Sequence, residues 1–325
     1  MIASIYRRAA TLLTLAFGFC AAPALAQPPW QPDRPVTLIV PYSVGGGTDA
    51  LARAVAKDLS DVWQQSVIVE NVPGADGMIG TRKVIGARPD GYTLLVQIHA
   101  ITLARHLPAS NGFDPLPQLE PITAYAELAG VFVATPKLPG ETLAETFQGC
   151  KTNARSCSFG TTESVARLQG QMLRADEGME NLVVVNYKGG GQLITDLVAG
   201  TVDMAVMGIT AAMPHYKSGA LKILATLGDK RTSITPDVPS AAEAGFPGLD
   251  AITWYGLFAP KGTPQAIVEG VAAATARAVQ GQTTQQTFAS LGAQAISPSP
   301  ADFAARIEAE SARMTELVQR FPFTQ

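Results

Sequence analysis

Residues 36–53 read VTLIVPYSVGGGTDALAR, an apolar run followed by three consecutive glycines and a helical pattern. Val36–Val40 has the continuous apolar character of a strand that is buried on both faces of a sheet. A helix is predicted to begin just after the loop, near Thr48 or Asp49, because either residue is a good N-cap. This unit of strand, glycine loop and helix indicates the fold class, since its repetition builds a parallel sheet flanked by helices.

The same strand-and-helix rhythm recurs along the chain. Further strands are predicted at 67–69, 93–98, 131–134, 158–159, 183–185, 202–207 and 222–227, with helices between them. An aromatic strand at 252–258 precedes three predicted helices, at 264–280, 284–291 and 301–321. Two such sheets, joined more than once, predict two lobes around a cleft. Lobe 1 is expected to comprise residues 27–125 and 252–325, and lobe 2 residues 126–251.

The N-terminal residues have the pattern of a secretory signal peptide, predicted to span residues 1–26. Arg7 and Arg8 precede an apolar run over 9–22, and Ala24-Leu25-Ala26 forms an A-x-A cleavage site. A membrane anchor is the alternative, but the run is short for a spanning helix and is followed by the helix-breaking Pro23. The mature chain is therefore expected in the periplasm and not inserted in the membrane.

The mature chain carries a modest negative charge. Without residues 1–26 it keeps 22 basic and 27 acidic residues, so its formal charge is −5. The sequence has no basic stripe of the kind that binds phosphate backbones, which argues against a nucleic-acid partner.

Two cysteines remain in the mature chain, Cys150 and Cys157. They are expected to pair as a disulfide, as close neighbours do in an oxidising compartment. A metal site is the weaker alternative, because the spacing fits no common zinc motif and no histidine lies nearby.

Four loops between predicted strands and helices are suited to a ligand: PYSVGGGTD (41–49), VPGADGMIG (72–80), GTTES (160–164) and NYKGGG (186–191). In an open parallel sheet, ligands bind beyond the carboxyl ends of the strands. Glycine lets backbone N–H groups approach a ligand closely, and a helix start adds unpaired N–H groups and a positive dipole end. Together these features predict a site for a small anion, with a carboxylate as the favoured candidate.

Other uses of the first loop fit less well. A P-loop needs a lysine that residues 41–53 lack, and Ala50 stands at the third glycine position of the dinucleotide fingerprint. A tight turn without a ligand is the remaining alternative, although three glycines exceed what a turn needs.

Catalysis finds little support. His99, His106 and His215 belong to no nucleophile–base motif, and neither G-x-S-x-G nor H-E-x-x-H occurs. His99 either lines the cleft or is an ordinary hydrogen-bonded histidine. Asp49 is interpreted as a helix cap, and the aromatic pair Trp254-Tyr255 as core.

At these motifs the chain resembles the Bug-type periplasmic solute-binding proteins, the receptor component of tripartite tricarboxylate transporters. The resemblance covers nearly the whole mature chain and rests on PDRPVTLIVPYSVGGGTDALAR, VENVPGADGMIGTRKV, RPDGYTLLV, NYKGGGQLITDLVAGTVDM, TPDVPSAAEAGFPG and TWYGLFAPKGTP. It implies a two-lobed α/β Venus-flytrap fold with mostly parallel sheets and flanking helices. It also implies a non-enzymatic role: capturing a small organic acid, amino acid or nicotinate-like acid for membrane transporter subunits.

The resemblance further implies that the loop after the first strand and a loop of lobe 2 hold the ligand's carboxylate. In lobe 1 the matching residues are Tyr42, Ser43, Val44, Gly45, Gly46, Gly47 and Asp49, with Ala75 in the Gly74–Gly77 turn. In lobe 2 they are Thr161, Thr162, Glu163, Ser164, Tyr187 and Gly189.

The lobe 2 loop GTTESVARL departs from the family pattern, which is rich in Gly and Ser and places histidine where Arg167 stands. A carboxylate at Glu163 would repel a bound carboxylate across a low-dielectric cleft. Either Glu163 accepts a hydrogen bond from a ligand amine or amide, or it is a helix-start residue that points to solvent.

Two further functions stay open at this point. One is a signalling receptor that binds the same ligand and docks on a sensor domain. The other is an exported enzyme that uses the anion loops as an oxyanion site, although the sequence shows no nucleophile or base for it. No metal or cofactor is implied, and a monomer is expected without a direct signal for it in the sequence.

Overall fold

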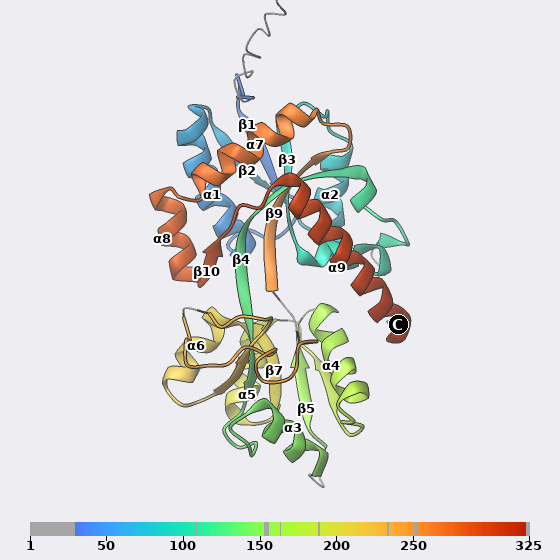
Figure 1. The fold of residues 1–325 in the computed structure, drawn as a ribbon. Coiled ribbons are helices and arrows are strands. Elements are labelled where there is room, and N and C mark those ends of the chain that lie inside the picture. The colour runs from blue at the N-terminus through green and yellow to red at the C-terminus, as the bar shows by residue number, and fades with distance from the viewer. Residues whose placement is uncertain are drawn as a thin grey trace, which may run out of the picture.

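The computed structural model describes residues 30–107, 110–152, 156–162, 164–187, 189–232, 234–249 and 252–322. The predicted signal peptide, residues 1–26, lies outside these ranges. Within them, ten strands form one mixed sheet in which the long strand β4 (Leu119–Ala134) links two groups of strands. Figure 1 shows that each group carries its own helices.

The first group has the strand order β2 (Val67–Asn71), β1 (Val36–Val40), β3 (Thr93–Ile98), β9 (Ile252–Pro260) and β4. β1 is parallel to both neighbours, whereas β9 is antiparallel to β3 and β4. Leu38 packs in one core cluster with residues of helices α1 (Gly47–Trp63), α7 (Gln265–Ala278) and α8 (Gln282–Leu291). Ile39 packs in another with residues of α2 (Met78–Ile85) and α9 (Pro300–Arg320). The prediction that this strand is buried on both faces is thus confirmed.

The second group continues from β4 to β7 (Met204–Gly208), β5 (Ser158–Thr161) and β6 (Val183–Asn186). Strand β8 (Lys222–Thr226) also pairs with this end of β4, and the short β10 (Ala293–Ala295) pairs with β4 near Leu128. The helices here are α3 (Leu143–Thr152), α4 (Ser164–Asp176), α5 (Gly190–Ala199) and α6 (Ile209–Lys217). The α/β class is therefore confirmed: β5 pairs parallel with β6 and β7, and antiparallel pairing runs through β4 and β9.

The strand predicted at 131–134 is only the end of β4. Its earlier residues pair with β9 from Leu119, opposite Pro260, to Ala129, opposite Ile252. The register shifts after Pro121, which explains how a proline is accommodated in a strand that has neighbours. Pro121 therefore led to the prediction of a break, although pairing with β9 stabilises a strand there.

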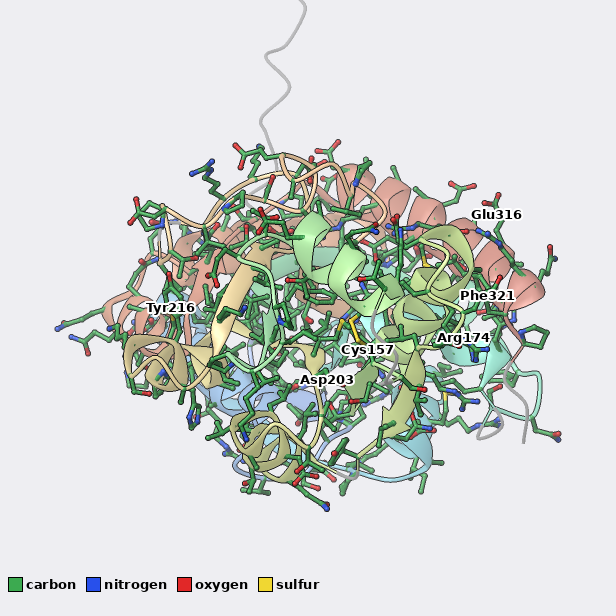
Figure 2. All side chains as sticks on the ribbon, turned by 90° about the horizontal axis from the view of Figure 1, so that it is seen from below. Cys157, Arg174, Asp203, Tyr216, Glu316 and Phe321 are labelled. Atoms are coloured by element: carbon green, nitrogen blue, oxygen red, sulfur yellow. A yellow bond between two sulfur atoms is a disulfide. The ribbon has the colours of Figure 1, made fainter. Side chains whose placement is uncertain are left out.

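Two interpretations of local chemistry are confirmed. Trp254 is fully buried, and its Nε1 donates a hydrogen bond to Glu310 Oε2 at 2.7 Å, so it belongs to the core. Cys150 of α3 and Cys157, just before β5, form a disulfide, which is visible beside the Cys157 label in Figure 2.

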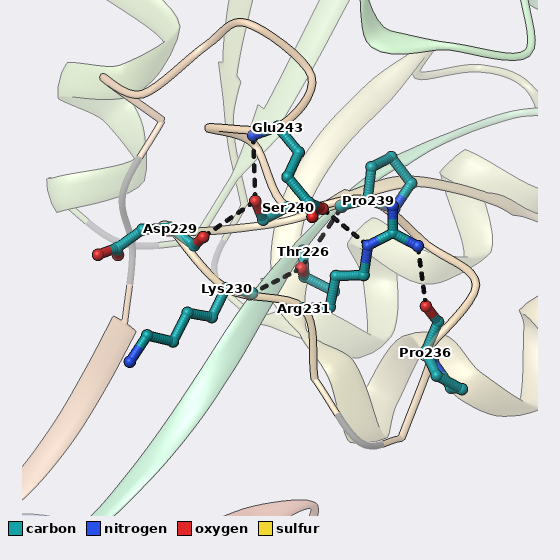
Figure 3. A network of polar contacts seen from close by, with 8 residues as sticks. All are labelled: Thr226, Asp229, Lys230, Arg231, Pro236, Pro239, Ser240 and Glu243. Carbon is teal, nitrogen blue, oxygen red and sulfur yellow. Dashed lines mark hydrogen bonds and ion pairs between the residues drawn. The ribbon is translucent and has the colours of Figure 1, made fainter.

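The long connection after β8 is ordered by a polar network (Figure 3). Arg231 Nε donates to Glu243 Oε2 at 2.7 Å, and the Ser240 N–H donates to the same oxygen at 2.8 Å. The Glu243 N–H in turn donates to Ser240 Oγ at 3.1 Å. The Ser240 and Arg231 hydrogen bonds lower the pKa of Glu243, so this carboxylate stays charged and fixes the motif TPDVPSAAEAGFPG.

Candidate functional site

Two cavities lie where loops of the first group of strands face the second group. The larger cavity has a volume of about 440 Å³, and the smaller about 170 Å³. Both are lined by Thr162, which follows β5, and by Val165 in the first turn of α4. The two cavities therefore adjoin at the start of α4, and we call them together the cleft.

The glycine loop after β1 and the start of α1 form one side of the larger cavity. Tyr42, Ser43, Gly46 and Thr48 line it. Gly46 is the N-cap of α1, and no side chain caps this helix. The first N–H groups of a helix have no intrahelical partner, so this end offers donors and a positive dipole to an anion.

The expectation that Thr48 or Asp49 caps the helix is wrong. The helix begins at Gly47, with Gly46 as its N-cap, so Asp49 lies within the first turn. Its Oδ2 accepts a hydrogen bond from the Gly45 N–H at 2.9 Å, and Asn71 Nδ2 donates to its Oδ1 at 2.9 Å. Arg53 Nε lies 2.9 Å from the same Oδ1. Asp49 therefore stabilises the glycine loop through these hydrogen bonds and does not line the cleft.

The charge of Asp49 is stabilised despite its burial. Burial raises the pKa of this carboxyl, but the hydrogen bonds from Arg53, Gly45 and Asn71 outweigh burial and hold the pKa below its ordinary value of 3.8. Asn71 Nδ2 also donates to the Tyr42 carbonyl oxygen at 3.1 Å. One ionised side chain thus fixes both ends of the loop.

Glycine starts two more helices at the smaller cavity. Gly189 is the N-cap of α5 and Gly208 that of α6, and neither helix has a side-chain cap. Gly190 and Gly208 line the smaller cavity. A side-chain cap is also absent at the start of α7, whereas Ser299 caps α9 through its side chain. The starts of α1, α5 and α6 thus leave N–H groups at the cleft for a ligand or water.

The turn at Gly74–Gly77 contributes through Asp76, which lines the larger cavity. Ala75, Asp76 and both flanking glycines have positive φ, between 48° and 125°. Such a conformation is costly for residues other than glycine and persists where its surroundings hold it in place. Behind the turn, a Cβ on Gly80 would lie 2.8 Å from Pro41 Cβ, so α2 packs directly against the glycine loop.

A series of hydrogen bonds connects residues that line the larger cavity. Tyr42 Oη donates to Gln97 Oε1 at 2.8 Å, and Gln97 Nε2 donates to Thr81 Oγ1 at 3.0 Å. The Ile98 N–H donates to Gln97 Oε1 as well, at 3.0 Å. These hydrogen bonds join the glycine loop to β3 and α2, and they position the Tyr42 ring.

The structure brings only part of the predicted set together. Tyr42, Ser43, Gly46 and Thr162 line the cleft, whereas Val44, Gly45, Gly47, Asp49, Ala75, Thr161, Tyr187 and Gly189 do not. Glu163 lies outside the described residues, and Ser164 begins α4. Tyr187 Oη donates to Asp196 Oδ2 at 2.7 Å, and burial and this bond raise the pKa of Tyr187 to about 12.

The sequence interpretation missed one wall of the cleft. Residues of the 3-10 helix η2 (His99–His106) and its flanks line the larger cavity: Ile98, Ala100, Ile101, Leu103, Ala104 and Leu107. His99 lines the smaller one, as one of its two interpretations expected. This segment follows the carboxyl end of β3, where ligands bind in such sheets, but it lacks the glycines that marked the other loops.

Two further observations concern the described part of the chain alone. Its helices include none with the length and apolar character needed to cross a membrane. Nor does it bring together three or more His, Cys, Asp or Glu side chains in a cluster suited to a metal ion.

Comparison with known proteins agrees with this geometry. The profile of the family described as "Tripartite tricarboxylate transporter family receptor" matches residues 51–322. Protein BugT of Bordetella pertussis is 33% identical over 284 residues, which cover 86% of this chain and 86% of BugT.

Solved structures show the same likeness over the whole fold. The periplasmic binding protein BugD is 30% identical with a TM-score of 0.70, covering 89% of this chain and 98% of its own. Rpa4515 of R. palustris, solved with adipate, is 30% identical with a TM-score of 0.74, covering 89% and 97%. The chain therefore belongs to the tripartite tricarboxylate transporter receptor family of periplasmic solute-binding proteins, which are transport binding proteins and not enzymes.

Proposed function

We propose that the protein is an extracytoplasmic receptor that binds a small carboxylate in the cleft and delivers it to the membrane subunits of a tripartite transporter. The uncapped start of α1 carries the proposal, because Gly46 and Thr48 line the larger cavity there. A Cβ on Gly45 or Gly47 would meet no atom within 4 Å, so the loop has open space at these two positions. Backbone donors beside open space suit a carboxylate oxygen.

The two groups of strands correspond, in this proposal, to lobe 1 (27–125 and 252–325) and lobe 2 (126–251). The lobes would close on the ligand by a hinge motion in the segments that connect them. Thr162 and Val165 support this division, since they bring lobe 2 residues to the cavity that holds the glycine loop. Export through cleavage of residues 1–26, and hence a periplasmic location, completes the proposal.

A thermal-shift screen of residues 27–325 tests the binding function. A carboxylate at about 100 times its Kd is expected to stabilise the fold by about 2.7 kcal/mol. The matched control is Gly46→Asp: Gly46 has φ −75° and ψ 167°, so aspartate fits there as an N-cap. The variant should fold normally and lose the shift, because its own carboxylate occupies the anion site. An equal shift in both proteins would place the ligand elsewhere.

Delivery is tested in cells. A strain without the gene should lose uptake of the carboxylate that gives the shift, and the intact gene should restore it. Normal uptake with a lost transcriptional response to that carboxylate would instead indicate a signalling receptor.

A further inference from the structure

We infer that the preferred ligand is a monocarboxylate with an apolar body, either aliphatic or aromatic. The inference rests on the proposed function, since the glycine loop is taken to hold the one carboxylate. It goes beyond that function by assigning the chemistry of the rest of the ligand, which the other walls of the cleft must accommodate.

The larger cavity is divided in chemical character. Its polar side is the glycine loop with the start of α1, and most of the remaining lining is apolar. The apolar side chains are Met78, Ile98, Ala100, Ile101, Leu103, Ala104, Leu107 and Val165. The volume of about 440 Å³ lies in the usual range for small-molecule sites, roughly 300–1,000 Å³. This polarity fits a molecule with one charged end and a hydrocarbon remainder.

The amide of Gln97, which lies within this lining, is already engaged in hydrogen bonds. Gln97 is almost fully buried, and its Oε1 accepts hydrogen bonds from Tyr42 Oη and the Ile98 N–H. Its Nε2 donates to Thr81 Oγ1. Because a carbonyl-type oxygen has two lone pairs, Gln97 Oε1 has no acceptor capacity left for a ligand hydroxyl.

The charged side chains of the lining also favour a ligand with a single carboxylate. Among the described residues that line either cavity, the side chains that can carry a charge near neutral pH are Asp76 and His99, and none is Lys or Arg. Among these described residues, a second carboxylate on the ligand would meet apolar side chains and no Lys or Arg, and it would be repelled by Asp76. Burying an unpaired charge is strongly unfavourable, so a second charge should weaken binding.

The smaller cavity is where a second carboxylate would have to bind, at the helix starts of α5 and α6. It holds only about 170 Å³, and eight of its lining residues are apolar: Leu128, Val165, Ala166, Leu193, Ile194, Val206, Met207 and Ala211. This composition favours the far end of a hydrocarbon body over a charged group.

Isothermal titration with probes of equal length tests the inference. Residues 27–325, freed of copurified small molecules by unfolding and refolding with the disulfide intact, are titrated with hexanoate, adipate, 6-aminohexanoate and hexanamide. Hexanoate is expected to bind at least tenfold more tightly than each of the others. Butanoate should bind roughly tenfold more weakly than hexanoate, as the loss of two buried methylene groups predicts. Phenylacetate then distinguishes an aromatic from an aliphatic body.

Each other result has a distinct meaning. Tighter binding of adipate or of 6-aminohexanoate overturns the apolar-body inference and leaves the carboxylate receptor intact. Equal binding of hexanamide and hexanoate contradicts the carboxylate site and leaves the apolar body intact. No binding of any probe overturns both.

A gain-of-function variant supplies an independent test. Ala100 is half-buried in η2 and lines the larger cavity. Ala100→Lys should reverse the preference to adipate over hexanoate, whereas the uncharged Ala100→Met should keep hexanoate first. An unchanged preference in a folded Ala100→Lys protein would contradict the charge argument. If that variant fails to fold, the probe series with the unaltered chain decides.

Discussion

Arg320 at the end of α9 forms an ion pair with Asp176 at the end of α4, and Arg320 Nη1 lies 3.0 Å from Asp176 Oδ2. Near its start the same helix buries Phe303 in the core of the first group of strands. Arg313 Nη2 also donates to the Gly248 carbonyl oxygen at 3.0 Å. Helix α9 therefore begins on one group of strands and ends on the other, and its end lies below the first group in Figure 1.

The packing along α9 reaches the ligand cavity. Met314 is buried in a cluster with Leu103 of η2 and with Val165 and Leu168 of α4. Leu103 and Val165 also line the larger cavity. The end of the helix adds a further contact, because Phe321 packs against the same cluster. The relative position of the two groups of strands is thus expected to depend on this helix.

Met314→Ala is therefore expected to lower both stability and ligand affinity. Removing a buried methionine side chain typically costs about 2–5 kcal/mol, and here the cavity wall loses its support. Urea unfolding and titration with the carboxylate measure the two effects. The control is Gln319→Ala, which changes an exposed residue of the same helix. Arg320→Ala should cost less than about 1 kcal/mol, because the pair is partly exposed. Lost stability with unchanged affinity would show that α9 does not influence the cleft.

Gly45 and Gly47 should respond differently to alanine. A Cβ meets nothing within 4 Å at either position, but Gly45 has φ +83° and Gly47 lies in the helix. Gly45→Ala is expected to cost about 1–2 kcal/mol and to weaken ligand binding, because an L-residue is strained in that region. Gly47→Ala should leave the free energy of unfolding unchanged or slightly raised, since alanine favours helix. Equal destabilisation by both substitutions, measured by urea unfolding, would contradict this account.

Much of the first strand and its loop could be predicted, because their signals are local. The run Val36–Val40 and the glycines after it predict a buried strand, a glycine loop and a following helix without any knowledge of distant residues, although the predicted cap at Thr48 or Asp49 is wrong. The role of Asp49 could not be predicted in the same way. Its partners include Asn71, which only the pairing of β1 with β2 brings close.

The apolar wall shows a second limit. The stretch Ile98–Leu107 has the composition of an ordinary core segment, and only the shape of the fold turns it towards a cavity. The long β4 shows a third limit, because Pro121 indicates a break that pairing with β9 overrides. In each case the missing information is a contact between residues far apart in the sequence.

The disulfide should stabilise the fold without affecting the ligand. Cys150 and Cys157 are seven residues apart, so closing this short loop is expected to contribute about 2–3 kcal/mol. Neither cysteine lines the cleft. The double variant Cys150→Ala/Cys157→Ala should therefore unfold at lower urea concentration and bind the carboxylate as before. A tenfold loss of affinity in the folded variant would show that the disulfide influences the cleft.

The predicted processing can be checked directly. Fractionation of cells that express the full chain should place the protein in the periplasm, and N-terminal sequencing should begin at Gln27. Ala26→Arg should block cleavage and leave a larger, membrane-associated form, since the A-x-A site requires small residues. A mature protein that still begins at Met1 would contradict the signal-peptide prediction.

Asp49 predicts a defined dependence on pH. Its folded-state pKa lies below 3.8, so the unfolded chain takes up a proton at a higher pH than the folded protein does. The stabilisation from Asp49 is therefore fully present well above pH 4 and is lost as the pH falls below 3.8 towards the folded-state pKa. Asp49→Asn should cost about 1–3 kcal/mol at pH 7, because buried hydrogen bonds to a charged acceptor are lost.

Urea unfolding at pH 7, 4 and 3 measures this effect. The curves of the unaltered protein and of Asp49→Asn should approach each other as the pH falls, because the carboxylate that distinguishes them becomes protonated. Asp61→Asn is the matched control: this residue lies on the same helix, is 66% exposed and pairs with Lys57. It should change stability by less than about 1 kcal/mol at any of the three pH values. A constant gap between the unaltered protein and Asp49→Asn would mean that the Asp49 charge does not hold the glycine loop.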